Sequence, residues 1–133
     1  MQGRILIDTS AYAHFRRGET RVLEILTTAE TIFLSAVSLG ELEAGFVLGS
    51  RPDENRNALR DFLAEPFVSV VPIDGAVAGR YGNLFAELRR AGTPVPTNDI
   101  WIAASAFHIG AQVVTFDTDF DRFRDLDRRI LAV

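Results

Sequence analysis

The feature that most constrains the fold of this chain is the alternation of short apolar runs with longer segments of helical periodicity. Candidate buried strands cover residues 3–8, 31–35, 67–73 and 111–117, and residues 128–133 offer a fifth. Strands that alternate with helices predict a parallel sheet with helices on both faces. We therefore expect one α/β domain over residues 1–133, a three-layer α/β/α sandwich with a central parallel sheet of four to five strands.

The segments between these runs carry helix signals of their own. Predicted helices cover residues 36–50, 52–65, 74–91 and 98–110, and a short helix follows the first strand with Thr9 or Ser10 as its cap. In residues 22–29 the apolar side chains fall on one helical face. That stripe and the 36–50 helix are expected to serve mostly as core, with a partner-binding groove as the alternative.

Composition excludes several kinds of chemistry. The chain has no cysteine, which rules out disulfides and thiolate metal sites, and only two histidines, which suits a zinc site poorly. All 14 basic residues are arginine, so mechanisms that need a lysine are excluded. The net charge of −4 makes broad nucleic-acid binding unfavourable and leaves only local arginine patches for it.

No segment of the sequence suggests a membrane. The first ten residues, MQGRILIDTS, lack the long apolar run of a signal peptide. No stretch approaches the roughly 20 apolar residues that a membrane span requires. The expected compartment is the cytoplasm.

Carboxylates follow the predicted strands at four places in the chain. They are Asp8 after the first strand, Glu41 two turns into the helix after the second, Asp99 at the start of an apolar helix, and Asp117 with Asp119 after the fourth. Ligands of parallel α/β sheets bind beyond the carboxyl ends of the strands. We expect these acids to converge at that edge.

Asp99 poses the sharpest physical question, because the residues after it are Ile100, Trp101 and Ile102. An ionised carboxylate among such neighbours is costly unless a positive group meets it. Oxygen-only ligands select hard cations such as Mg²⁺ or Mn²⁺, which also leave positions for substrate phosphate. A divalent cation therefore accounts for Asp99, and phosphodiester hydrolysis suits what the chain contains and lacks.

Each acid also has a simpler interpretation when taken alone. Asp8 can cap the next helix, Asp99 can be an acid in the first turn that the helix dipole stabilises, and Glu41 can be a solvated helix residue. Asp117 and Asp119 can be turn residues. Asn98 has two interpretations of equal weight, holding the loop before Asp99 or capping the helix.

Four segments, ILIDTSAY, SAVSLGELEAG, PTNDIWIAASA and VVTFDTDFDRF, resemble in order the motifs of PIN-domain ribonucleases, and most closely the VapC toxins of VapBC toxin–antitoxin pairs. The resemblance spans essentially the whole chain and implies a PIN-like fold. Residue by residue, it places the acidic quartet of the family on Asp8, Glu41, Asp99 and Asp117. Its hydroxyl positions fall on Ser10 and Thr115 as supporting residues. Asp119 lies close enough to Asp117 to share or replace its metal-binding role.

The resemblance also implies an activity and partners. It implies a Mg²⁺- or Mn²⁺-dependent endoribonuclease acting on tRNA or rRNA, which forms homodimers and is inhibited by a VapB-type antitoxin. The alternatives are a non-catalytic interaction module on a PIN-like fold and a nuclease acting on DNA. Phosphate-receiver domains and haloacid-dehalogenase phosphatases share strand-end aspartates but ordinarily use a lysine, which this chain lacks.

Overall fold

The computed structural model describes residues 2–133 and contains a five-stranded sheet in which all neighbouring strands are parallel. The strands are β1 (Gln2–Ile7), β2 (Ala29–Ser35), β3 (Val68–Val71), β4 (Gln112–Thr115) and β5 (Arg128–Ile130). Their spatial order is β3-β2-β1-β4-β5, so β1 lies at the centre with β2 and β4 beside it.

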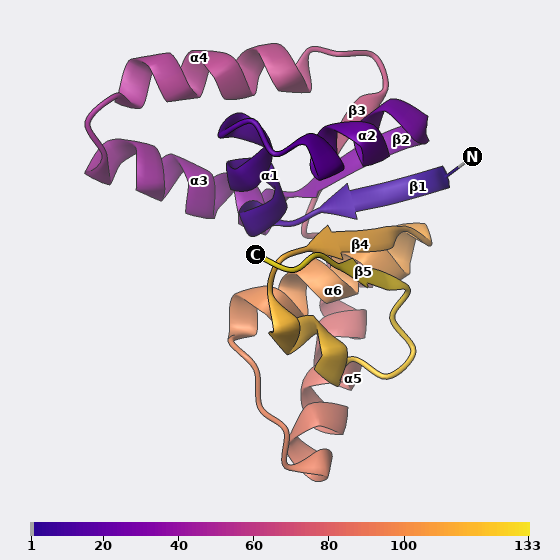
Figure 1. The fold of residues 1–133 in the computed structure, drawn as a ribbon. Helices are drawn as coiled ribbons and strands as arrows, with labels where there is room; N and C mark the ends of the chain where they lie inside the picture. Colours follow the sequence, from indigo (N-terminus) through magenta and orange to yellow (C-terminus); the bar gives the residue numbers. More distant parts are fainter. Residues whose placement is uncertain (1) are drawn as a thin grey trace.

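Six α-helices flank this sheet (Figure 1). They are α1 (Thr9–Arg16), α2 (Thr20–Thr28), α3 (Ala36–Leu48), α4 (Pro52–Leu63), α5 (Gly75–Ala91) and α6 (Thr97–Ile109). Helices α1, α2 and α4 lie on one side of the sheet and α5 and α6 on the other, while α3 continues beyond the end of β2. The predicted three-layer α/β/α sandwich is confirmed.

Helices cover both faces of the sheet, which explains why the strand sequences are continuous apolar runs. Successive side chains of a strand point to opposite faces, so Ile5 and Ile7 pack with α1 and α2, whereas Leu6 packs with α5 and α6. All three side chains are fully buried. A strand covered on both sides has no solvent face that could take a polar residue.

Two local details differ from the sequence prediction. The N-cap of α1 is Asp8, as in the simpler interpretation of that residue, and not Thr9 or Ser10: its Oδ1 accepts the backbone N–H of Ala11 at 2.8 Å. A 3₁₀ helix, η1 (Thr118–Arg122), follows β4 where only turn residues were expected. Both differences concern carboxylates that cap a short helix directly after a strand.

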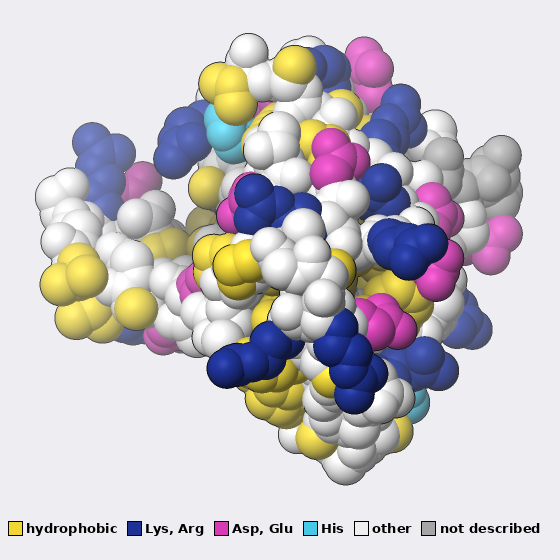
Figure 2. Space-filling model, turned by 90° about the horizontal axis from the view of Figure 1, so that it is seen from below, with side chains coloured by type: hydrophobic (Ala, Val, Ile, Leu, Met, Phe, Trp, Pro, Cys, Tyr) yellow, Lys and Arg dark blue, Asp and Glu magenta, His cyan; other side chains and the backbone are white. Residues whose placement is uncertain are grey.

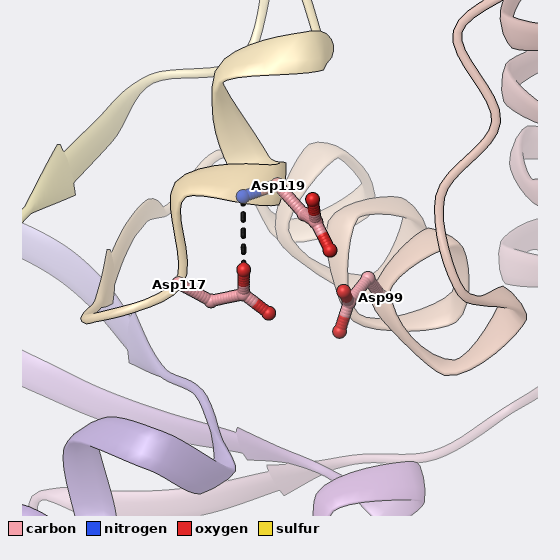
Figure 3. A group of neighbouring side chains, drawn as sticks. All are labelled: Asp99, Asp117 and Asp119. Carbon is pink, nitrogen blue, oxygen red and sulfur yellow. Dashed lines mark hydrogen bonds between the residues drawn. The ribbon is translucent and has the colours of Figure 1, made fainter.

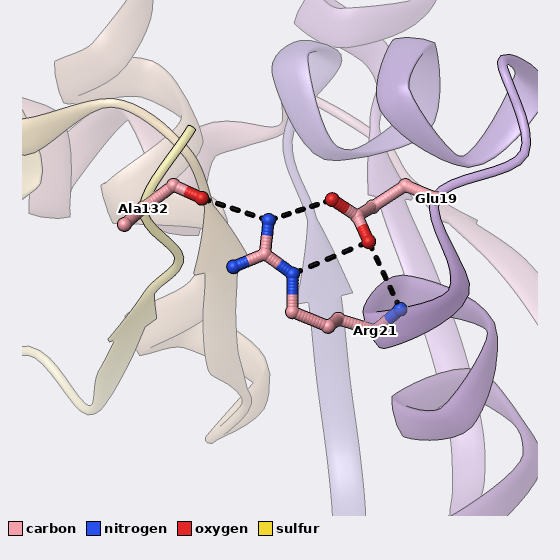
Figure 4. A network of polar contacts seen from close by, with 3 residues as sticks. All are labelled: Glu19, Arg21 and Ala132. Atoms are coloured by element: carbon pink, nitrogen blue, oxygen red, sulfur yellow. Dashed lines mark hydrogen bonds and ion pairs between the residues drawn. The ribbon is translucent and has the colours of Figure 1, made fainter.

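The C-terminal residues are tied to the start of α2 by Arg21 (Figure 4). Its Nη2 donates to Glu19 Oε1 at 2.6 Å and to the carbonyl oxygen of Ala132 at 2.7 Å. The side-chain and backbone hydrogen bonds from Arg21 hold the pKa of Glu19 down to about 2. The guanidinium lies 5.6 Å from the ring centre of Phe116, against which His14 packs at 3.9 Å. The end of β4 is thereby fixed against the first two helices.

Within residues 2–133, no helix combines the length and apolar character needed to cross a membrane.

Candidate active site

The central strands β1 and β4 end side by side and carry the first candidate residues. The register pairs Ile7 with Val114, and the N–H of Asp8 donates to the carbonyl oxygen of Val114 at 3.2 Å. Asp8 therefore lies at the carboxyl edge of the sheet, beside the end of β4. Asp117 follows that end by two residues. Topology alone thus brings together two acids that are more than a hundred residues apart.

Asp8 is 4% exposed, and protein groups engage both of its oxygens. Oδ1 accepts the hydroxyl of Ser10 and the N–H of Ala11, both at 2.8 Å, and Oδ2 accepts the hydroxyl of Thr115 at 2.5 Å. The same Thr115 oxygen accepts the N–H of Asp117 at 2.9 Å. Ser10 and Thr115 therefore contact the acid that they were expected to support, and Thr115 links it to the Asp117 segment.

Three other carboxylates face a common space beyond the sheet edge (Figure 3). Asp99 in the first turn of α6, Asp117 and Asp119 each offer an oxygen, and these oxygens all lie within 4.8 Å of one another. Oδ1 of Asp117 accepts the N–H of Asp119 at 2.9 Å, which caps η1 and fixes the pair. Both Asp117 and Asp119 point toward Asp99, so the geometry is compatible with either or both of them as the fourth acid, and that assignment stays a prediction.

Glu41 lies outside this group of three but is held toward it. Its Oε1 accepts the hydroxyl of Thr9 at 2.6 Å, and its Oε2 accepts the side-chain amide of Asn98 at 3.3 Å. Asn98 therefore does not cap α6, and its side chain connects the start of α6 to α3. Thr9 was not predicted as a site residue, because a threonine directly after a strand is typical of an ordinary helix cap.

Asp99 has a strongly raised pKa. Burial, and then the charges of Asp117, Asp8, Asp119 and Glu41, raise its pKa to about 7. Burial also raises the pKa of Asp8, against the opposing effect of its three hydrogen bonds. All five acids therefore belong to one electrostatic unit, although only three of them crowd together.

The raised pKa of Asp99 predicts a pH-dependent cost in the metal-free protein. Between about pH 4 and pH 7 the unfolded chain releases this proton while the folded chain holds it, so the stability contributed by Asp99 falls as pH rises. Asp99→Asn removes that dependence. We expect the melting temperature of the variant minus that of the unmodified protein, both in EDTA, to be a few degrees larger at pH 8 than at pH 4. A difference that does not change with pH would contradict the assignment.

The donor set fits a divalent cation. Within residues 2–133, no hydrogen bond is made to the carboxylate oxygens of Asp99 or Asp119, which leaves them free to coordinate, and Asp117 has one oxygen free. Hard cations such as Mg²⁺ and Mn²⁺ favour such oxygen ligands. Asp8 and Glu41 are already engaged by protein donors, so their fit as direct ligands is weaker than the expectation from sequence. These roles stay predictions.

The fold and the site together define the class: a three-layer α/β/α protein with a carboxylate-lined centre at the carboxyl edge of a parallel sheet. A family model, the PIN domain, matches residues 5–126. The chain belongs to the PIN domain family.

Individual relatives agree with this family. The chain is 36% identical over 122 residues to the plasmid stability protein StbB of Pseudomonas syringae pv. tomato, covering 86% of this chain and 88% of that protein. It is 34% identical over 94 residues to ribonuclease VapC4 of Mycobacterium tuberculosis, covering 71% and 72%. Among solved structures, DNA-bound VapBC from Salmonella typhimurium superposes with a TM-score of 0.83 at 27% identity, over 98% of each chain.

Proposed function

We propose that this protein is a Mg²⁺- or Mn²⁺-dependent endoribonuclease and the toxin of a toxin–antitoxin pair. The observation that carries the proposal is the group of Asp99, Asp117 and Asp119, whose carboxylates face one another with oxygens left free. Three carboxylates so placed repel one another unless a cation is present. The name of a relative that matches 71% of this chain at 34% identity, a ribonuclease, favours RNA as the substrate.

A bound divalent cation would supply positive charge at the scissile phosphate and lower the pKa of an attacking water. The side chains of the protein do the rest. Asp99, Asp117 and Asp119 would hold the cation through their free oxygens, and the buried Asp8 carboxylate adds negative charge at the same edge of the sheet. Thr115 and Ser10 fix that carboxylate, and Thr9 and Asn98 fix Glu41. Positioning of this kind needs no histidine, cysteine or lysine.

Two other functions are less well supported. A non-catalytic interaction module has no need for a half-buried carboxylate, Asp99, whose pKa is raised to about 7 by burial and then by the charges of four other acids. A nuclease acting on DNA would use the same acids, so geometry alone does not distinguish it. The substrate expected here is structured RNA, tRNA or rRNA.

The deciding experiment is cleavage of total bacterial RNA by the purified protein. We expect discrete fragments with Mg²⁺ or Mn²⁺, none with EDTA, and none from a duplex DNA of similar length under the same conditions. Mapping the fragment ends then identifies the RNA. Cutting that persists in EDTA, or cutting of DNA alone, would overturn the proposal.

The partners proposed are a VapB-type antitoxin and a second copy of this chain. A groove of about 440 Å³ runs between α1, α2 and α4, and its apolar lining includes Leu23 and Phe67, which are 48% and 44% exposed. Of the predicted 22–29 stripe, Val22, Ile25 and Leu26 are core, as expected. Leu23, which lies outside that stripe, lines the groove together with Leu26. An amphipathic antitoxin segment suits it.

The end of α3 offers a separate apolar surface for the second copy. Val47 and Leu48 are 68% and 88% exposed, which is costly on a monomer. Light scattering of the protein alone should give the mass of a dimer, and Leu48→Glu should give that of a monomer. A monomeric parent would exclude the homodimer.

A further inference from the structure

Two adjoining hollows lie along one side of α5, against the segment that links η1 to β5. Their volumes are about 770 Å³ and about 200 Å³, and they share walls at Leu84, Glu87 and Phe123. We call them together the α5–η1 groove. Four arginines line it: Arg80, Arg90, Arg122 and Arg124. Figure 2 shows the face that carries α5 and α6, where several basic side chains stand out with acidic ones between them.

One end of the groove adjoins the acidic centre from two sides. Arg122 follows Asp119 by three residues in η1, so the two lie on the same side of the 3₁₀ helix and about 6 Å apart along its axis. On the opposite wall, Thr93 belongs to the loop that leads to Asp99. Arg122 Nη1 donates to the carbonyl oxygen of Pro94 at 2.6 Å and so joins the two walls. The groove is therefore a continuation of the site.

The groove has positive charge that no ion pair neutralises. Within residues 2–133, the five ion pairs include none of its four arginines. Of its acids, Asp121 is already paired with Arg128 at 3.0 Å, which leaves Glu87 and Asp125 against four guanidinium groups. The chain as a whole carries −4. The unpaired arginines therefore favour a polyanion in this groove, against the negative net charge of the chain.

We propose that the α5–η1 groove binds the sugar-phosphate backbone of the RNA on one side of the scissile bond. Arg122 and Arg90 hold the phosphates nearest the acids, and Arg124 and Arg80 hold those farther along. Guanidinium groups suit this because each can donate two parallel hydrogen bonds to one phosphate. Arg122 is already oriented by Pro94, so it loses less freedom on binding. The inference rests on the proposed function and adds to it a path for the substrate.

The test compares two double variants that remove equal charge. Arg90→Gln with Arg124→Gln changes the groove, and Arg51→Gln with Arg60→Gln changes α4 on the other side of the sheet. Binding of mixed bacterial tRNA is measured in EDTA between about 50 and 200 mM salt, where phosphate contacts dominate. Cleavage of the same RNA is measured with Mg²⁺.

The groove variant should reduce the slope of log K against log salt by about 1.4 to 1.8, the value for two lost phosphate contacts. Its KM should rise about 10-fold with kcat within about twofold, because the arginines do not touch the reacting atoms. The α4 variant should match the parent. If the parent cuts RNA and the groove variant keeps the parental slope and KM, this inference alone is overturned. If the parent cuts no RNA, the proposed function is overturned and the inference with it.

Discussion

Asp99→Asn should lower RNA cleavage by at least about 10³-fold, the scale of losing one preorganised charge from a catalytic centre. Asparagine has the shape of aspartate but no charge, so the change removes one of the three carboxylates that face the common space. It also removes the side chain whose pKa is raised by burial and by the other four acids. The variant should therefore fold, remain stable without metal, and fail to gain stability from Mg²⁺.

Two measurements distinguish loss of the catalytic carboxylate from damage to the fold. Initial rates of fragment release give the activity, and melting curves with and without Mg²⁺ report the cation. Asp53→Asn, on the exposed first turn of α4, is the matched control and should behave as the parent in both. If the Asp99→Asn protein cuts RNA at a rate within tenfold of the parent, Asp99 has no catalytic role.

Thr115→Val should have the largest effect of any change that leaves the acids themselves intact. Valine fills the same volume, but it leaves Oδ2 of Asp8 and the N–H of Asp117 without their hydrogen-bond partner. Unsatisfied groups at a buried, charged site cost about 2–4 kcal/mol together. The pKa of Asp8 should rise further, because the hydroxyl of Thr115 is the strongest influence that lowers it.

Urea unfolding at pH 7 measures the loss of stability, and cleavage over a range of pH measures the effect on Asp8. The rate should fall and its acidic limb should shift to higher pH. Thr118→Val is the control, since Thr118 is exposed in η1 and lies three residues after Thr115. A Thr115→Val protein within about 0.5 kcal/mol of the parent, with an unshifted pH profile, would mean that the Thr115 contact does not support the site.

The convergence of the acids could be predicted from the sequence, but not which of their oxygens are engaged by hydrogen bonds and which remain free. Each acid follows a strand or begins a helix, and the edge rule for parallel sheets places such residues together. That rule says nothing of which oxygens remain free. Asp8 and Glu41 have theirs engaged by Thr115, Thr9 and neighbouring groups, whereas Asp99 has none engaged among the described residues. Hydrogen bonds between residues 32 to 107 positions apart depend on tertiary packing, which no local pattern encodes.

The sequence by itself determined the layers of this protein. A period near 3.6 in the helices and continuous apolar runs in the strands require a sheet buried on both faces, and with one core per domain this leaves few arrangements. Gly92 ends α5 with φ of +69°, a conformation that glycine adopts without strain. These are local properties of the chain, so a local pattern suffices to predict them.

Only the tertiary structure decided the position of β1 between β2 and β4, and with it the contact of Asp8 with Thr115. The same is true of η1, which Asp117 caps and which aims Asp119 at Asp99 while placing Arg122 against Pro94. The physical reason is common to both. Strand order and side-chain direction depend on the free energy of the whole packed core, and segments distant in sequence contribute to it equally with near ones.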